Sequence, residues 1–132
     1  MNIRTLLAAA SLALAGMAHA QDIVVIGHPS AAALSKDQVA DLFLGKSQAL
    51  TPLDLSDSSP LYAAFYRKAT GREVAQVKSV WSRVIFTGKG QPPKQLPDAA
   101  AVKRAVAADP KAVGYIEKSA VDGSVKVLLA LD

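Results

Sequence analysis

The chain has 132 residues, a formal net charge of +4 and no cysteine. Its length is that of one domain of ordinary size, and the missing cysteines exclude disulfides, a thiolate nucleophile and cysteine metal sites. The positive charges form no Lys/Arg block, so nucleic acid is not an expected partner.

Residues 1–20 have the pattern of a cleaved secretory signal peptide. Arg4 supplies the positive start, LLAAASLALAG is a short apolar run, and AHA before Gln21 is a small-residue cleavage site. The apolar run is shorter than the roughly 20 residues that a membrane span needs. We therefore expect one domain over residues 21–132, without membrane insertion after cleavage. Together with the alanine-rich, basic composition, the signal indicates the periplasm of a Gram-negative bacterium.

The first elements of the expected domain are a buried strand, a capped helix and a second strand. Residues 23–26 are continuously apolar and end at Gly27, which predicts a strand in a sheet covered on both faces. Ser35 then caps a helix over KDQVADLFLGK. The segment ALTPLDL predicts a second short strand, and Pro52 favours an edge position or a position at the entry of the strand.

Three helices and two strands are expected in the remainder. One helix covers about residues 60–69, and REVAQVKSVWSRVIFTG has a clear helical period that directs Trp81, Val84 and Ile85 to the core. QPPKQLP indicates a loop with extended character, and Asp98 caps a helix over AAAVKRAVAADP. AVGYIE and VKVLLAL are strands separated by a segment with an Asp-Gly turn, a turn common in hairpins. The order predicts an α/β domain, with a mixed sheet of about four to five strands flanked by helices.

No catalytic or metal centre is expected. His28 is the one histidine after residue 20, it follows a strand in the loop GHPS, and the chain has no G-x-S-x-G elbow. Asp54 and Asp57 in DLSD have no third ligand nearby and lack the spacing of a calcium loop. We therefore expect a protein that is not an enzyme and that uses no metal and no cofactor.

The stretch DLSDSSPL has two interpretations. In one, Asp57 or Ser58 caps the following helix, and Pro60 fits its first position because that position needs no amide donor. In the other, free amide groups and the hydroxyls of Ser58 and Ser59 hold an anion at the positive end of the helix dipole. Spacing alone leaves both open.

A second group of candidate ligand-binding residues lies in WSRVIFTGKGQPP. Arg83 is off the apolar stripe and free to reach an anion, and Thr87 and Lys89 follow it at a Gly-Lys-Gly turn. The alternative is a solvated helix end, where the dipole favours a lysine. Ser30, in the loop after the first strand, completes the candidate set.

The segments LSKDQVADLFLGK, VIFTGKGQPP and DPKAVGYIEKSAVDGSVKVL together resemble the short, exported, phosphate-transporter-type substrate-binding proteins. These belong to the type II periplasmic binding protein superfamily, and the likeness covers nearly all of residues 21–132. It implies a single lobe of that fold and a small oxyanion ligand. In two-lobed relatives an arginine and a Ser-Gly-Thr-like helix mouth grip phosphate. Ser58 and Ser59 match that mouth, but the arginine has no equivalent, because Asp54 and its leucine neighbours occupy that position.

Two functions follow from this resemblance. One is a periplasmic anion-binding module that works with an ABC permease. The other is a sensory or protein-interaction lobe that binds no solute, whose concave face with Tyr62, Tyr66 and residues 88–93 docks a membrane sensor or another subunit. In either case we expect a monomer or a homodimer.

Overall fold

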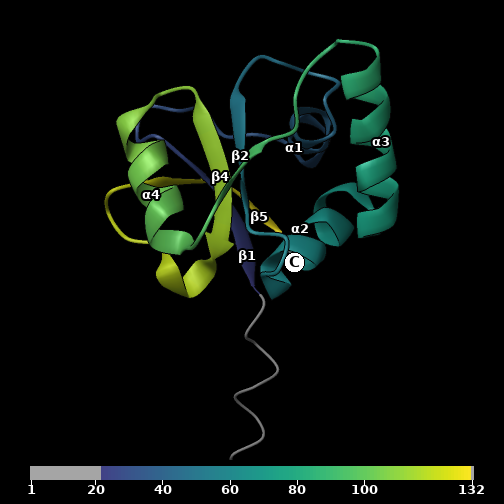
Figure 1. Ribbon diagram of the computed structural model, residues 1–132. Helices are drawn as coiled ribbons and strands as arrows, with labels where there is room; N and C mark the ends of the chain where they lie inside the picture. The colour runs from purple at the N-terminus through teal and green to yellow at the C-terminus, as the bar shows by residue number, and fades with distance from the viewer. Residues whose placement is uncertain (1–21, 132) are drawn as a thin grey trace, which may run out of the picture.

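The computed structural model describes residues 22–131, so the predicted signal peptide lies outside the described residues (Figure 1). In chain order the elements are β1 (Ile23–Gly27), α1 (Lys36–Phe43), β2 (Thr51–Leu55), α2 (Pro60–Thr70), α3 (Val74–Phe86), β3 (Lys94–Leu96), α4 (Ala99–Ala108), β4 (Ala112–Glu117), the 3-10 helix η2 (Lys118–Ala120) and β5 (Lys126–Leu131). Among these residues no helix has both the length and the apolar character needed to cross a bilayer.

The strands form one mixed sheet in the order β3-β2-β4-β1-β5. β2 runs parallel to β3 and β4, whereas β1 is antiparallel to β4 and β5. This five-stranded α/β architecture confirms the predicted fold class.

One detail of the predicted topology was wrong. Residues 94–96, expected in a loop, form the edge strand β3, which pairs with residues 53–55 of β2. β4 and β5 were predicted as strands without a pairing, and in the sheet β1 lies between them. Both the pairing of β3 with β2 and the position of β1 between β4 and β5 depend on residues that are distant in sequence.

Helices cover both faces of the sheet (Figure 1). α4 packs on one face, α1 and α2 pack on the other, and α3 lies against α2. All five residues of β1 are buried, as its continuous apolar run predicted. α4 approaches β4 so closely that a Cβ added at Gly114 would lie 2.6 Å from Cγ1 of Val102, so the strand needs glycine at this position.

The predicted caps of α1 and α4 are confirmed. Ser35 and Gln38 form a capping box, in which the Ser35 side chain accepts a hydrogen bond from the Gln38 amide. The Asp98 side chain accepts a hydrogen bond from the amide of Ala101. These local bonds fix where the two helices begin.

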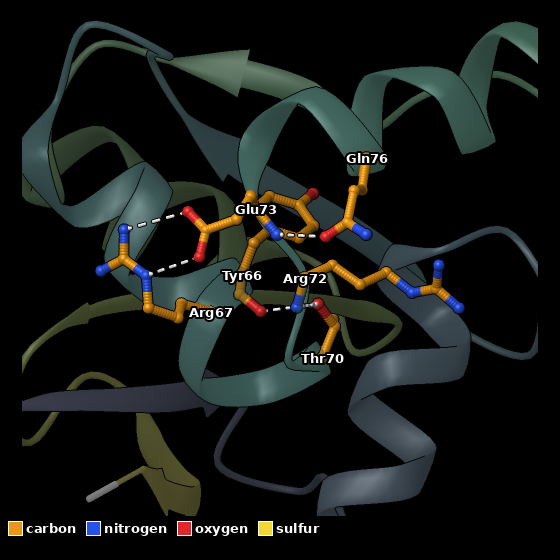
Figure 2. Close-up of polar contacts among 6 residues, drawn as sticks. All are labelled: Tyr66, Arg67, Thr70, Arg72, Glu73 and Gln76. Atoms are coloured by element: carbon orange, nitrogen blue, oxygen red, sulfur yellow. Dashed lines mark hydrogen bonds and ion pairs between the residues drawn. The ribbon is translucent and has the colours of Figure 1, made fainter.

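Side-chain contacts fix the corner between α2 and α3 (Figure 2). The guanidinium of Arg67 pairs with the carboxylate of Glu73, with 3.3 Å between Nε and Oε2. The Gln76 side chain accepts a hydrogen bond from the Glu73 amide at 2.9 Å, and the Thr70 hydroxyl donates to the Tyr66 carbonyl at 2.6 Å. These contacts link the end of α2 to the start of α3.

α3 presents a narrower apolar stripe to the core than its sequence predicts. Val77 and Trp81 are buried, and the indole N–H of Trp81 donates to the Phe43 carbonyl at 3.0 Å. Ile85, expected in the core, is instead 51% exposed, and Phe86 is 92% exposed. The reason is that α3 packs on neighbouring helices rather than on the sheet, so that its last turn extends beyond them.

Candidate functional site

A buried carboxyl group lies near the end of β2. The side chain of Asp54 is almost completely buried, with 3% of the residue exposed. The hydroxyl of Tyr66 donates to Oδ2 of Asp54 at 2.9 Å, and the hydroxyl of Tyr115 donates to Oδ1 at 2.9 Å. The Tyr115 oxygen also accepts a hydrogen bond from the Leu55 amide at 3.3 Å. Residues from α2, β2 and β4 thus hold one acidic side chain.

Burial changes the ionisation of this cluster. Desolvation raises the pKa of Asp54 from 3.8 to about 7, although the hydrogen bonds from Tyr115 and Tyr66 act in the opposite direction. Burial, reinforced by the charge of Asp54, raises the pKa of both Tyr66 and Tyr115 far above the ordinary value. The tyrosines therefore remain hydrogen-bond donors, and Asp54 is the member of the cluster that titrates near neutral pH.

Asp54 borders a cavity of about 460 Å³ between α2, α3 and the segment that leads into β3. Its lining is mostly apolar and aromatic, and consists of Asp54, Tyr62, Tyr66, Val77, Lys78, Trp81, Ser82, Ile85, Pro92, Pro93 and Gln95. We call it the Asp54 cavity. It brings together Tyr62, Tyr66 and part of the 88–93 segment, as the expected concave face required. The two tyrosines are buried, however, so they form the wall of a hollow and do not project as docking side chains.

The predicted serine site is a compact turn before α2. The Ser59 side chain caps the helix and accepts a hydrogen bond from the Leu61 amide at 3.1 Å. The Ser58 amide donates to the Ser56 hydroxyl at 3.2 Å, and the two hydroxyls of Ser56 and Ser58 lie 2.8 Å apart. These bonds are those of the capping interpretation, with Ser59 as the cap in place of Asp57 or Ser58.

Arg83, Thr87 and Lys89 line one hollow of about 260 Å³ near the end of α3. Lys46 joins them there, and none of the lining residues is acidic. The Thr87 hydroxyl donates to the Val84 carbonyl at 3.0 Å. We call this the basic hollow. Because its walls do not include Ser58 or Ser59, the two predicted groups of ligand-binding residues do not share one pocket.

Ser30 belongs to a third location, the exposed loop after β1. Its hydroxyl lies 2.7 Å from Nδ1 of His28, and its amide donates to the same nitrogen at 3.0 Å. These contacts describe a local turn. Within residues 22–131 no three metal-binding side chains gather in one place.

The sequence analysis did not find the role of Asp54. Its local signal is an acidic residue inside the apolar segment PLDL, which is unusual for a strand buried by helices. The hydrogen-bond partners of Asp54 have no such local signal in the sequence, because Tyr66 and Tyr115 lie 12 and 61 residues further along the chain.

The fold is shared with solved structures, among them those of two phosphate ABC transport proteins. One is the crystal structure of an ABC-type phosphate transport receptor from Vibrio cholerae, with a TM-score of 0.63 and 20% sequence identity over 83% of this chain and 46% of the receptor. The other is a putative phosphate ABC transporter substrate-binding protein with bound phosphate from Clostridium perfringens, with a TM-score of 0.62 and 21% identity over 83% of this chain and 45% of that protein. No protein-family model and no curated protein matches the chain. The chain spans less than half the length of these two proteins, and it has the fold of one lobe of a phosphate-type substrate-binding protein, as its sequence predicted.

Proposed function

We propose that the protein is a periplasmic solute-binding module whose ligand is a small oxyanion of the phosphate type. The observation that carries this proposal is the shared fold over 83% of the chain with two phosphate transport proteins, one of them solved with phosphate bound. The module would work with an ABC permease. It is a binding protein and not an enzyme.

Two surfaces are suited to an oxyanion. At the serine turn, Ser58 and Ser59 add hydroxyl donors to the positive end of α2. In the basic hollow, Arg83 offers a planar fork of donors, and Lys89 lies on the same wall. Both surfaces are solvent-exposed, so binding by this chain alone should be weak and salt-sensitive. Tight binding then requires a second wall, which another polypeptide would supply.

Calorimetric titration with phosphate and with sulfate, at low and at physiological salt, tests the proposal. We expect heat that decreases as salt rises. Arg83→Ala should weaken binding more than Lys89→Ala, because a guanidinium makes two directed bonds whereas an exposed ammonium contributes mostly screened charge.

A third variant separates the two surfaces. If the anion lies at the serine turn, Ser58→Ala weakens binding and Arg83→Ala leaves it unchanged. Absence of heat and of any thermal shift with both oxyanions in the unmodified protein would rule out oxyanion binding by this chain.

The end of α3 favours a second candidate function, that of a protein-interaction lobe. Phe86 is 92% exposed and follows Ile85, which is 51% exposed. An apolar patch formed by neighbouring exposed side chains can mark a contact surface. A pull-down from a periplasmic extract tests this function. We expect the native protein to recover a membrane sensor or another subunit, and the Phe86→Ser variant to recover neither. Equal recovery by both proteins contradicts a contact at this surface.

A further inference from the structure

We propose that the Asp54 cavity is a separate binding site for a small apolar molecule that carries a protonated amine, with the amine placed beside Asp54. This site is distinct from the serine turn and from the basic hollow, and it does not depend on the oxyanion proposal. Three features support this site: the acceptor capacity of Asp54, the charges around the cavity and the composition of its walls.

Asp54 has unused acceptor capacity next to the cavity. Each of its carboxylate oxygens accepts one hydrogen bond, from Tyr66 and from Tyr115 at 2.9 Å. A carboxylate can accept about four hydrogen bonds, so further acceptor positions remain. Because the side chain lines the cavity, a donor bound there can use them.

The ionic environment favours a positive ligand over a neutral or negative one. The two tyrosines are neutral donors that offset part of the desolvation of Asp54, yet burial still holds the pKa of this carboxyl at about 7. Lys78 also lines the cavity, but its ammonium pairs with the carboxylate of Asp57 at 3.5 Å and is largely exposed. An ammonium group in the cavity would therefore provide the opposite charge that the buried carboxylate lacks.

The remaining walls fit an apolar body. Tyr62, Trp81, Ile85 and two consecutive prolines supply them. The indole N–H of Trp81 already donates to the Phe43 carbonyl, so the ring offers the cavity apolar and π surface. Aromatic faces also attract an ammonium group. A volume of about 460 Å³ is within the range of small-molecule pockets, roughly 300–1,000 Å³.

Calorimetry with three probes of equal chain length tests the ligand class. Hexylamine, hexan-1-ol and hexanoate each have a straight chain of six carbons and differ in the charge of the head group. At pH 8 we expect hexylamine to bind at least about tenfold more tightly than hexan-1-ol, as a charge-assisted hydrogen bond adds more than 1.4 kcal/mol. Hexanoate should show no binding. Equal affinities for the amine and the alcohol, or no binding of hexylamine at millimolar concentration, would overturn the proposal.

The pH dependence of the native protein provides a test that needs no variant. Hexylamine affinity should fall severalfold between pH 8 and pH 6, because Asp54 becomes protonated. The other groups around Asp54 are Tyr62, Tyr66 and Tyr115, whose pKa values are raised so that they stay neutral, and the Lys78–Asp57 ion pair. Hexan-1-ol affinity should not change. A hexylamine affinity independent of pH in this range contradicts a role for Asp54.

Matched variants locate the amine. Asp54→Asn keeps the side-chain size and an acceptor for a tyrosine, and it should abolish the preference for amine over alcohol while leaving hexan-1-ol affinity within about twofold. Asp57→Asn makes the same change at an exposed position three residues away and should preserve the preference. Loss of the preference in Asp57→Asn, or its persistence in Asp54→Asn, would place the amine elsewhere.

Two further measurements complete the test. Ile85→Ala removes part of the apolar wall and should weaken hexylamine and hexan-1-ol equally, severalfold each. Saturating phosphate should leave hexylamine affinity unchanged, so that failure of the oxyanion proposal and failure of this one give different results. Unequal effects of Ile85→Ala on the two probes, or direct competition by phosphate, would contradict a separate site.

Discussion

Asp54 and Ser58 lie four residues apart in the chain, yet the fold satisfies their polar groups in opposite ways. Asp54 is buried and bonds to residues 12 and 61 positions away. Ser58 bonds to Ser56, two positions away, in an exposed turn. The buried carboxyl group therefore depends on the assembled fold, whereas the serine turn depends on its own segment. Substitutions in the two regions should differ accordingly in their effects on stability.

The largest effect is expected for Trp81→Ala, in the wall of the Asp54 cavity. The substitution removes a buried aromatic ring and leaves the Phe43 carbonyl without its donor, so the free energy of unfolding should fall by about 3–5 kcal/mol. Urea denaturation measures this change. Ile85→Ala, on the same helix and at a half-exposed position, is the control and should lose about 1 kcal/mol or less. A comparable loss in the two variants would mean that Trp81 is not a core residue.

The second effect concerns Asp54 itself. Asp54→Ala leaves the buried hydroxyls of Tyr66 and Tyr115 without their acceptor, and the free energy of unfolding should fall by about 2–4 kcal/mol. Asp57→Ala removes an exposed ion pair instead and should change stability by less than about 1 kcal/mol. Denaturation of both variants beside the native protein tests the contrast. Similar losses from the two changes would show that burial does not distinguish these carboxyl groups.

Local features of the fold were predictable from the sequence, and features that depend on distant residues were not. The apolar run of β1 and the caps at Ser35 and Asp98 act within a few residues, and each was predicted. β3 was missed because its three residues are mostly exposed and are recognised as a strand by their pairing with β2. Ile85 was placed in the core by its period, since the period identifies the apolar face of a helix but not where its neighbours end.

The candidate site follows the same division. The serine turn and the cluster of Arg83, Thr87 and Lys89 were recognised as local motifs, and their role in binding stays a prediction. Tyr62, Tyr66 and residues 88–93 were expected on one concave face, but the place of Asp54 in it was not recognised, because α2, α3 and the segment before β3 form the cavity together. The pattern PLDL showed an acidic residue in an apolar strand, but it did not show which tyrosines would reach that residue.

The stability of the folded protein should depend on pH through Asp54. Burial raises the pKa of Asp54 from 3.8 to about 7, so the folded protein retains a proton between these values that the unfolded chain releases. The contribution of Asp54 to stability is therefore complete below pH 4 and decreases by up to about 1.4 kcal/mol per pH unit until pH 7. Unfolding free energies of the native protein and Asp54→Asn, measured from pH 4 to pH 8, should converge or cross as pH rises.

Asp122 has a shifted pKa of the opposite sign. Hydrogen bonds from Ser124 and the nearby Lys103 lower the pKa of Asp122, so its contribution to stability has the opposite dependence and is lost at low pH. That contribution is the same in the native protein and in Asp54→Asn, and it cancels in their difference. A difference that is constant from pH 4 to pH 8 would show that Asp54 ionises alike in the folded and unfolded states.

The smallest effects are expected in the serine turn. Ser59→Ala removes the side-chain cap of α2 and should lower the free energy of unfolding by about 1 kcal/mol. Ser58→Ala keeps that cap and loses only the contact with the Ser56 hydroxyl, so its change should stay within about 0.5 kcal/mol. Thermal and urea unfolding of the two variants measures the difference. Equal losses at both positions would mean that the turn is stabilised as one network, and that its hydroxyls are less free to bind an anion than a simple cap allows.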